Sequence, residues 1–391
     1  MHSVALGEIS TPITKGATPT TYGFQWQASG VPFLRSECVS EKGLDMRQSM
    51  FISSAAHASL QRSQVVEGDI LLTITGNIGR VVQLEGIEEA NINQHIARVR
   101  VIDERLHPRY VFHYLSQRVV RRYYESITTG QAYPQISLAQ VQSTSIPLIS
   151  KTEQKEIVAA LDDADKLINS LERLISKKHA IKQGMMQELL TGRTRLPGFK
   201  QAWSRATLGR ISKVTMGQSP VGSSYNTKGN GLPLIQGNAD VSKRATIERV
   251  WTSSPTKISE PGNVILTVRA PVGHAAIASH RICLGRGVCG LDAGKDNSFL
   301  FHLLVSNESR WSLFSQGSTF TAVGSNEVNS FTIDWPCDPE ERSAIAKVLQ
   351  DADQEIDALQ RRLESVSSIK QGMMQELLTG RVRLPVGGEA R

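Results

Sequence analysis

The segment IKQGMMQELLTGR stands at residues 181–193 and returns, residue for residue, at 369–381. Other pairs of segments match less closely: GDILLTITGNIGRVV from Gly68 resembles GNVILTVRAPVGHAA from Gly262. Internal repeats decide an architecture, because they show that one structural unit has been built more than once. The sequence therefore predicts a tandem duplication.

The two copies differ in how well they match along their length. Residues 1–150 and 207–337 share a skeleton of glycines and apolar runs, but their loop lengths and polar residues differ. Residues 151–197 and 339–385 keep one offset of 188 positions. One part of each half has therefore varied its surface, while the other part has repeated it.

Length and composition set broad limits. A chain of 391 residues suggests two domains or more. Its 44 Lys and Arg against 37 Asp and Glu give a formal charge of +7, which favours a polyanionic partner without establishing one. No apolar run is long enough to cross a bilayer and the start lacks the order of a signal peptide, so a cytoplasmic location is the default expectation. Four scattered cysteines without a C-x-x-C pair predict reduced thiols rather than a metal cluster or disulfides; they are Cys38, Cys283, Cys289 and Cys337.

The repeated parts carry the signals of long helices. Ser150 marks the first start, and Asp338, Pro339 and Glu341 predict a capping box at the second. Glycine and then proline stop both helices; these residues are Gly192, Pro197, Gly380 and Pro385. Between these signals, apolar residues recur at alternating steps of four and three, the period of a coiled-coil seam. We predict helices over about 151–191 and 339–379.

The linker indicates the direction of the second helix. Each helix would be roughly 60 Å long, whereas the linker between 192 and 207 spans at most roughly 50 Å. A linker of that reach hardly retraces the first helix. The sequence therefore predicts an antiparallel pair with a pseudo-twofold axis and one globular domain at each end.

The identical segments admit two interpretations. Their residues could pack against each other across the pseudo-dyad. Alternatively, they form two equal docking surfaces for two copies of one partner. Glycine inside a helix costs about 1 kcal/mol relative to alanine, and methionine offers adaptable apolar surface, so we favour docking. The residues concerned are Gly184, Met185, Met186, Gly372, Met373 and Met374.

A strand, a glycine turn and a strand follow one another in both variable parts. Residues 70–73 form one apolar strand, and Gly76 and Gly79 allow a tight reversal after it. Polar residues at these turns would project from a rigid edge, although each taken singly can also be ordinary turn chemistry. They are Thr75, Asn77 and Arg80 in the first copy and Arg269 and His274 in the second.

The next strand pair is predicted over 91–101 and 282–292. The second copy has a G-x-G-x-x-G spacing at Gly285, Gly287 and Gly290. A dinucleotide site needs this spacing to close a strand and open a helix, and helical pattern resumes well beyond it. We therefore interpret the glycines as a bulge beside the basic residue Arg286.

A single helix is predicted over 109–127 in the first copy and over 298–314 in the second, each followed by a loop. The loops combine glycine with amide, hydroxyl and aromatic side chains that can meet base edges. These are Gln131 and Tyr133 in the first copy and Ser318, Thr319 and Phe320 in the second. No P-loop, zinc-protease motif, nucleophile elbow or methyltransferase motif occurs, so a binding protein is favoured over an enzyme.

The two LG-x-I starts, the two strands of the GD-ILLT type, the two long helices and the two QGMMQELLTGR-x-RLP ends resemble the specificity subunit of type I restriction-modification systems. The resemblance covers nearly the whole chain. It implies an α+β fold in which two target recognition domains of mixed α/β type are separated by two long antiparallel helices forming a coiled coil. The implied boundaries are 1–150 for the first recognition domain, 151–195 for the first spacer helix, 196–337 for the second domain, 338–385 for the second helix and 386–391 for a tail.

The resemblance also implies partners. Each recognition domain would read one half of a bipartite site in double-stranded DNA, and the helices would set the half-site spacing. Two methyltransferase subunits would bind S-adenosylmethionine, and two ATP- and Mg-dependent restriction subunits could join. This chain would bind no cofactor and no metal and would have no catalytic residue. The expected DNA-binding residues are Thr75, Asn77, Arg80, Gln94, His95, Gln131, Tyr133, Gln236, Asn238, Arg269, His274, Arg286, Ser318, Thr319 and Phe320.

Two rival interpretations remain from the sequence. The chain could be a coiled-coil scaffold with two protein-binding domains and no DNA binding. It could also be a self-sufficient DNA-modifying enzyme, although the missing methyltransferase motifs oppose this.

Overall fold

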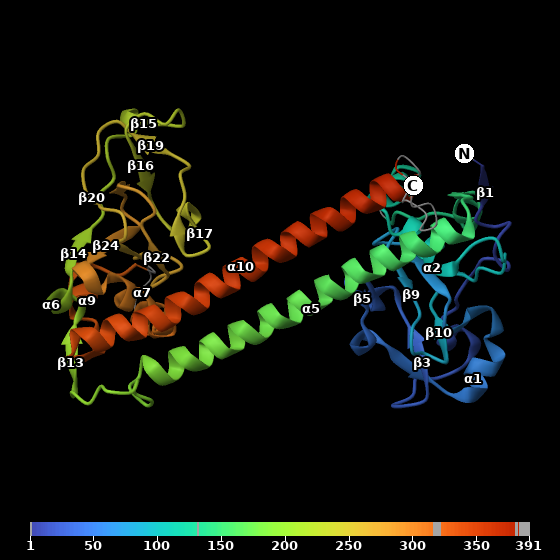
Figure 1. The fold of residues 1–391 in the computed structure, drawn as a ribbon, viewed down its shortest axis with the longest axis horizontal. Coiled ribbons are helices and arrows are strands. Elements are labelled where there is room, and N and C mark those ends of the chain that lie inside the picture. The colour runs from blue at the N-terminus through green and yellow to red at the C-terminus, as the bar shows by residue number, and fades with distance from the viewer. Residues whose placement is uncertain (1, 131–132, 316–321, 380–381, 383–391) are drawn as a thin grey trace, which may run out of the picture. The chain divides into compact units, whose positions relative to one another are not determined.

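The computed structural model describes every residue except 1, 131–132, 316–321, 380–381 and 383–391. The chain divides into two compact units, and each contains a globular part with a stretch of both long helices. Unit 1 comprises Met1–Leu171 and Arg362–Arg391, and unit 2 comprises Glu172–Arg361. Figure 1 labels their elements.

In the described residues of unit 1, the globular part contains two four-stranded sheets and two short strand pairs. One sheet has the order β2-β11-β8-β9 and the other the order β6-β3-β10-β7, in which β10 and β3 run parallel. The strands are β1 (Ser3–Ala5), β2 (Thr14–Lys15), β3 (Val31–Leu34), β4 (Val39–Ser40), β5 (Gly43–Leu44), β6 (Met50–Ile52), β7 (Gln64–Val66), β8 (Ile70–Thr73), β9 (Val81–Gln83), β10 (Glu89–Ile92), β11 (Ile96–Val99) and β12 (Ser145–Pro147). The helices of this part are α1 (Ser54–Ser59), α2 (Pro108–Leu115), α3 (Arg118–Ser126) and α4 (Leu138–Gln142).

Unit 2 repeats this plan with longer sheets. Its strand order β14-β24-β21-β22 corresponds to β2-β11-β8-β9, and its parallel pair β16 and β23 corresponds to β3 and β10. The strands are β13 (Trp203–Thr207), β14 (Lys213–Met216), β15 (Tyr225–Asn226), β16 (Leu232–Ile235), β17 (Val241–Ser242), β18 (Ala245–Thr246), β19 (Trp251–Thr252), β20 (Ile258–Ser259), β21 (Val264–Thr267), β22 (Ala275–Ile277), β23 (Ile282–Leu284), β24 (Val288–Asp292) and β25 (Thr332–Pro336). The helices of this part are α6 (Leu208–Ile211), α7 (Asn297–Ser306), α8 (Glu308–Ser315) and α9 (Ser325–Ser330).

The strand predicted over 70–73 is confirmed as β8, which is fully buried. The single strands predicted over 91–101 and 282–292 are wrong, because a turn divides the first into β10 and β11 and the second into β23 and β24. The single helix predicted after them is wrong in both copies, because α2 and α3 replace the first and α7 and α8 replace the second. Side chains at the breaks bind the preceding carbonyls: the Ser116 hydroxyl donates to Phe112 O at 2.8 Å, and Asn307 Nδ2 donates to Leu303 O at 2.8 Å. Such local bonds compete with the helical ladder.

Helices α5 (Lys151–Leu189) and α10 (Pro339–Leu377) each have 39 residues and begin where the sequence predicts. Ser150 caps the first, since its Oγ accepts the Glu153 amide at 3.2 Å. Asp338 caps the second through the Glu340 amide at 3.0 Å. The predicted capping box is wrong, however. Glu341 is fully buried and binds Arg195 and Trp203 instead, with Arg195 Nη2 donating at 2.8 Å.

Within each unit the two helix stretches run antiparallel and are joined by an ion pair. In unit 1, Lys370 Nζ pairs with Asp165. In unit 2, Lys182 pairs with Asp353. These pairs are copies of each other, because Lys370 stands 188 positions after Lys182 and Asp353 stands 188 positions after Asp165. A coiled coil along the full helices stays a prediction.

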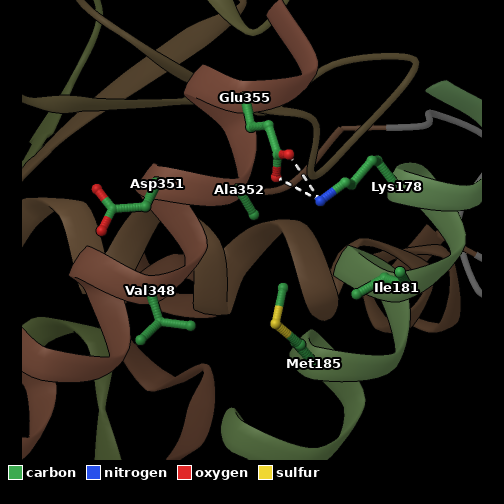
Figure 2. A pocket seen from close by; sticks show the side chains of 7 residues that line it. All are labelled: Lys178, Ile181, Met185, Val348, Asp351, Ala352 and Glu355. Atoms are coloured by element: carbon green, nitrogen blue, oxygen red, sulfur yellow. Dashed lines mark hydrogen bonds and ion pairs between the residues drawn. The ribbon is translucent and has the colours of Figure 1, made fainter. Parts of the chain in front are cut away.

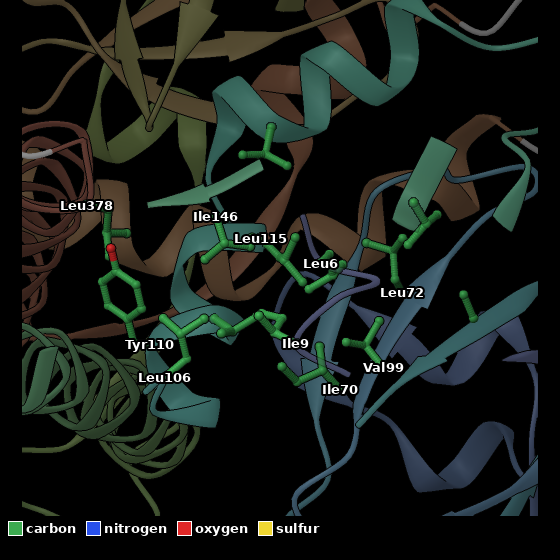
Figure 3. Packing of buried hydrophobic residues seen from close by; sticks show 14 of the residues in the cluster. Leu6, Ile9, Ile70, Leu72, Val99, Leu106, Tyr110, Leu115, Ile146 and Leu378 are labelled. Atoms are coloured by element: carbon green, nitrogen blue, oxygen red, sulfur yellow. The ribbon is translucent and has the colours of Figure 1, made fainter. Parts of the chain in front are cut away.

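Each unit has its own apolar core, and the ends of the long helices contribute to it. In unit 1, Leu378 joins a cluster that contains Leu6, Ile9 and Tyr110 (Figure 3). Leu161 belongs to the same cluster. In unit 2, the corresponding cluster contains Leu190 and Leu349. Burial of apolar area is the main stabilising term in such cores, so each globular part is anchored to its own helix stretches. Among the described residues, no helix is long and apolar enough to cross a membrane.

Candidate nucleic-acid interface

One tight turn is built in the same way in both units. In unit 1, the Thr73 hydroxyl donates to Asn77 O at 2.5 Å and accepts the Arg80 amide at 3.0 Å. In unit 2, the Thr267 hydroxyl donates to Pro271 O at 2.5 Å and accepts the His274 amide at 2.9 Å. A buried threonine at the strand end thus fixes the β8–β9 and β21–β22 turns, which makes each a rigid platform.

The described residues that follow the gap in each late loop lie against this turn. Thr75 pairs with Gln135 across an isolated bridge, and the Gly76 amide donates to Pro134 O at 3.2 Å. In unit 2, Arg269 makes the equivalent bridge to Ala322. The structure therefore brings together two segments that sequence analysis proposed separately. Tyr133, 71% exposed, belongs to this loop in unit 1; the candidates Gln131, Ser318, Thr319 and Phe320 lie outside the described residues.

The candidates on the first turn differ in accessibility. Asn77 and Arg269 are exposed. Arg80 and His274 are partly buried, and neither Arg80 Nε nor His274 Nδ1 has a hydrogen-bond partner in the described part of the chain. Burial, followed by the nearby Arg244, lowers the pKa of His274, so it favours the neutral ring. Asn77 and Arg269 are therefore the better placed of these side chains to meet a ligand.

The second turn connects β10 to β11 in unit 1 and β23 to β24 in unit 2. Gln94 and His95 occupy the first, with Gln94 Nε2 3.2 Å from His95 Nε2. Arg286 is exposed on the second. The glycine spacing around it joins two strands, so the strand-to-helix context of a dinucleotide site is absent there.

Two further candidates follow β16 in unit 2. Gln236 and Asn238 are exposed, and the Gln236 amide donates to Asp240 Oδ2 at 2.8 Å. The same strand end approaches the second turn, since the Gly285 amide donates to Ile235 O at 2.7 Å. Gln236, Asn238 and Arg286 therefore belong to one edge of unit 2.

Of the residues predicted to dock a partner, the methionines fit packing within the chain better, whereas the glycines do not. Met185 and Met186 are partly buried against the core of unit 2, and Met373 and Met374 against the core of unit 1. Their apolar surface is therefore shared with the chain's own interior.

The two helix glycines have no such role. A Cβ atom built on Gly184 or Gly372 would meet nothing within 4 Å. Two neighbours in the repeat, Ile181 and Ile369, are not among the predicted docking residues but are 45% and 58% exposed. Their positions three residues before the glycines place them on the same helix face.

A shallow groove of about 290 Å³ lies between α5 and α10 in unit 2 (Figure 2). Lys178 and Glu355 pair across it at 2.6 Å. Ile181 and Met185 line it from α5, opposite Val348 and Ala352 of α10. The groove therefore contains two members of the repeated segment.

One cluster has the residue types of a metal site. Single ligand atoms of His113, Asp162 and Asp165 lie within 4.8 Å of one another. Both carboxylates already have cationic partners, since Arg109 Nε donates to Asp162 at 2.8 Å and Lys370 pairs with Asp165. The cluster is therefore an ion-pair network that joins α2 to the long helices.

Comparison with known proteins gives the family. A family model for the type I restriction modification DNA specificity domain matches the chain twice, at residues 1–182 and 200–368. The putative type I restriction enzyme MjaX specificity subunit of Methanocaldococcus jannaschii is 30% identical over 376 residues, which cover 91% of this chain and 88% of that protein. The MjaVIII specificity subunit of the same organism is 24% identical and covers 82% of this chain and 80% of that protein.

Two solved structures share the fold. A chain from a structural study of assembly and conformational transition in the type I R-M system has a TM-score of 0.62 at 24% identity, and covers 97% of this chain and 98% of that one. The type I restriction-modification S subunit of M. genitalium has a TM-score of 0.65 at 13% identity, and covers 96% of this chain and 95% of that one. The chain belongs to the type I restriction-modification specificity subunits.

Proposed function

We propose that this chain selects the DNA target of a type I restriction-modification complex, with each unit reading one half of a bipartite site. One observation carries the proposal. The same fold is built twice, and the same family model matches both copies, while the exposed side chains on the equivalent turns differ. Equal platforms with unequal side chains fit two half-sites of unequal sequence.

The geometry of the duplex supports this reading. A DNA duplex has dyad symmetry in its backbone, so two related domains can enter major grooves on one face, with about 34 Å per helical turn between them. Phosphate contacts supply affinity, while side chains at base edges choose the sequence. The net charge of +7 is consistent with the first requirement.

The turns and late loops form the proposed reading surface. Asn77 and Tyr133 are exposed on this surface in unit 1, and Arg269 in unit 2. Amide and guanidinium groups match the donor and acceptor patterns of the major groove, and their rigid turns keep the entropic cost of binding low. We extend this role to the other candidates named from the sequence.

Helices α5 and α10 serve as a coiled-coil spacer in this proposal, and their repeated segments dock two methyltransferase subunits. Gly184 and Gly372 support the docking role, because nothing in either unit needs the absence of a side chain there. Ile181 and Ile369 add exposed apolar area beside them. Equal segments in an antiparallel pair would present equal faces to two copies of one partner.

Catalysis belongs to the partners in this proposal. The methyltransferase subunits hold S-adenosylmethionine and methylate the DNA, and any restriction subunits use ATP and Mg. This chain contributes target choice and binds no cofactor. The alternative is a protein-interaction scaffold that does not touch DNA.

The proposal is tested by purifying the native complex through a tag on this chain. We expect methyltransferase subunits to copurify and the complex to retain sequence-specific duplex on a filter, whereas this chain alone transfers no methyl group from labelled S-adenosylmethionine. Copurification without any duplex binding would favour the scaffold. Methyl transfer by the chain alone would show that it is an enzyme.

A further inference from the structure

The second turn places one residue of each unit at the same point of the fold. Ile92 pairs with Leu34 in the parallel strand pair of unit 1, and Leu284 pairs with Ile235 in that of unit 2. The three residues that follow each pair, 93–95 and 285–287, make the turn. Gln94 and Arg286 are therefore the central residues of corresponding turns.

Backbone hydrogen bonds confirm the correspondence. The first turn residue donates to the neighbouring strand in both units, from Asn93 to Leu34 O at 3.0 Å and from Gly285 to Ile235 O at 2.7 Å. The third turn residue accepts a hydrogen bond from the residue after β8 or β21. The Ile74 amide donates to His95 O at 2.9 Å, and the Val268 amide donates to Gly287 O at 2.9 Å. Both turns are thus tied on both sides.

In each unit, the central side chain forms a hydrogen bond with a hydroxyl group from the corresponding loop, and this bond braces it. The Thr18 hydroxyl donates to Gln94 Oε1 at 2.7 Å. Arg286 Nε donates to the Ser219 hydroxyl at 2.9 Å. Thr18 and Ser219 are themselves counterparts, because each follows a tightly packed glycine by two residues. A Cβ on Gly16 would lie 1.7 Å from Ile92 O, and a Cβ on Gly217 would lie 2.0 Å from Gly285 O.

The brace leaves a defined set of hydrogen-bonding groups on each side chain. A carbonyl oxygen has two lone pairs and an amide nitrogen has two N–H groups. Among the described residues, Gln94 uses one of each, on Thr18 and His95, and keeps one acceptor and one donor. Within the same part of the chain, Arg286 uses Nε on Ser219, and its two Nη groups remain as a pair of donors.

These remaining groups match two different base edges. Adenine presents N6–H as donor and N7 as acceptor in the major groove, which suits one acceptor and one donor on glutamine. Guanine presents O6 and N7 as two acceptors, which suits the paired donors of arginine. A phosphate contact would not explain why an uncharged glutamine occupies this position in one unit with the same brace.

We propose that the centre of the second turn specifies one base pair in each half-site, with Gln94 selecting adenine and Arg286 selecting guanine. This inference rests on the proposed function and adds the chemical identity of one contacted base on each side. Thr18 and Ser219 are positioning residues, because they orient the side chains that touch the base.

The test is a reciprocal exchange in the native complex. Wild-type, Gln94→Arg and Arg286→Gln complexes are bound to a randomised duplex pool, and the retained duplexes are sequenced. Gln94→Arg should change adenine to guanine at one position of one half-site, and Arg286→Gln should change guanine to adenine in the other half. The preference at each position should change by about 10- to 100-fold, with the remaining positions unaltered.

Arg281→Gln is the matched control, because Arg281 is an exposed arginine five residues away that pairs with Glu260 at 3.1 Å. It should leave every base preference intact. Thr18→Val and Ser219→Ala should weaken discrimination by a few-fold at the same two positions, which a merely structural role would not do.

Two results would overturn the inference. If Arg286→Gln weakened all duplexes equally, as a lost phosphate contact does, the base assignment would be wrong while the proposed function stood. If the wild-type complex retained no preferred sequence, the proposed function would fail and this inference with it.

Discussion

The long helices and the turns of the globular parts have diverged to different degrees. On the helices, the pairs Asp165–Lys370 and Lys182–Asp353 use the same residues at repeat positions. On the second turn, the backbone and the bracing hydroxyl are kept, but the glutamine of unit 1 corresponds to an arginine in unit 2. The duplication has preserved residues where the two copies must fit each other and changed them where our proposal places the ligand.

The largest effect expected from a single substitution concerns the first turn, where support beneath the same backbone differs. Gly273 has φ +85°, and a Cβ there would lie 2.3 Å from the buried Trp311. Gly79 has φ +77°, but its nearest contact, at 3.0 Å, is the flexible Arg121 side chain. Gly273→Ala should lower the free energy of unfolding by about 3 kcal/mol or more, and Gly79→Ala by about 1–2 kcal/mol.

Urea denaturation of the two variants measures this difference. Equal losses would mean that the two turns are supported equally, contrary to the packing described. Trp311 stacks on Phe331 at 3.9 Å, so it has little room to move away from the new methyl group.

The second prediction breaks the conserved helix pairing. Lys370→Asp places a second carboxylate beside Asp165 and should cost about 2–3 kcal/mol, since this pair is mostly buried. Adding Asp165→Lys should recover most of the loss. Lys166→Asp is the control, because Lys166 and Asp163 are 77% and 74% exposed and such pairs contribute under about 1 kcal/mol. A reversed double variant no more stable than Lys370→Asp would contradict the pairing.

The third prediction uses two histidines that lie at repeat positions of α2 and α7. Burial lowers the pKa of both His113 and His302 to about 4. Asp162, Arg109 and Lys370 face His113, while Lys182 and Asp353 face His302. The unfolded chain takes up these protons first, so this contribution to stability is complete above about pH 6.5 and is lost progressively as the pH falls from about 6.5 to about 4.

Between about pH 7 and about pH 5, each histidine should remove about 1–2 kcal/mol of stability. Thermal unfolding at the two pH values measures the loss, and the double variant His113→Gln and His302→Gln should show a smaller one. An unchanged pH dependence would mean that the rings are not buried as neutral groups.

The smallest effect on stability concerns the helix glycines. Gly184→Ala and Gly372→Ala should each raise the free energy of unfolding by up to about 1 kcal/mol, because alanine is the better helix former and the added methyl meets nothing. Larger side chains there, as in Gly184→Gln, should keep the fold but reduce methyltransferase copurification. Gln183→Ala, on a neighbouring exposed position, is the control. Unreduced copurification would remove the docking role from these glycines.

The sequence predicted those parts of the fold that depend on local signals and repetition. Ser150 and Asp338 act as caps, Gly192 adopts φ +67°, and the strand at 70–73 is buried as expected. The failures involve tertiary partners. Glu341 does not form the predicted capping box, because its carboxylate accepts a charge-assisted hydrogen bond from Arg195, which is far away in sequence.

The candidate site was predictable as segments but not as an arrangement. The first turn and the late loops were predicted from their glycines and polar residues, whereas the second turn was predicted as part of a strand with a bulge beside Arg286. Nothing local indicated that Thr18 and Ser219 would reach Gln94 and Arg286, because those contacts cross 76 and 67 residues. Comparing the two copies would have indicated these contacts, because Thr18 and Ser219 carry hydroxyl groups at corresponding positions of the repeat.

The most direct measurement is methylation sequencing of the host genome with the wild-type chain and with Tyr133→Ala, which alters an exposed residue of unit 1. The account predicts a bipartite methylated motif in the wild type and, in the variant, a changed preference in one half of that motif with the other half intact. A variant that changed both halves, or a genome whose methylation did not depend on this chain, would contradict two independent readers.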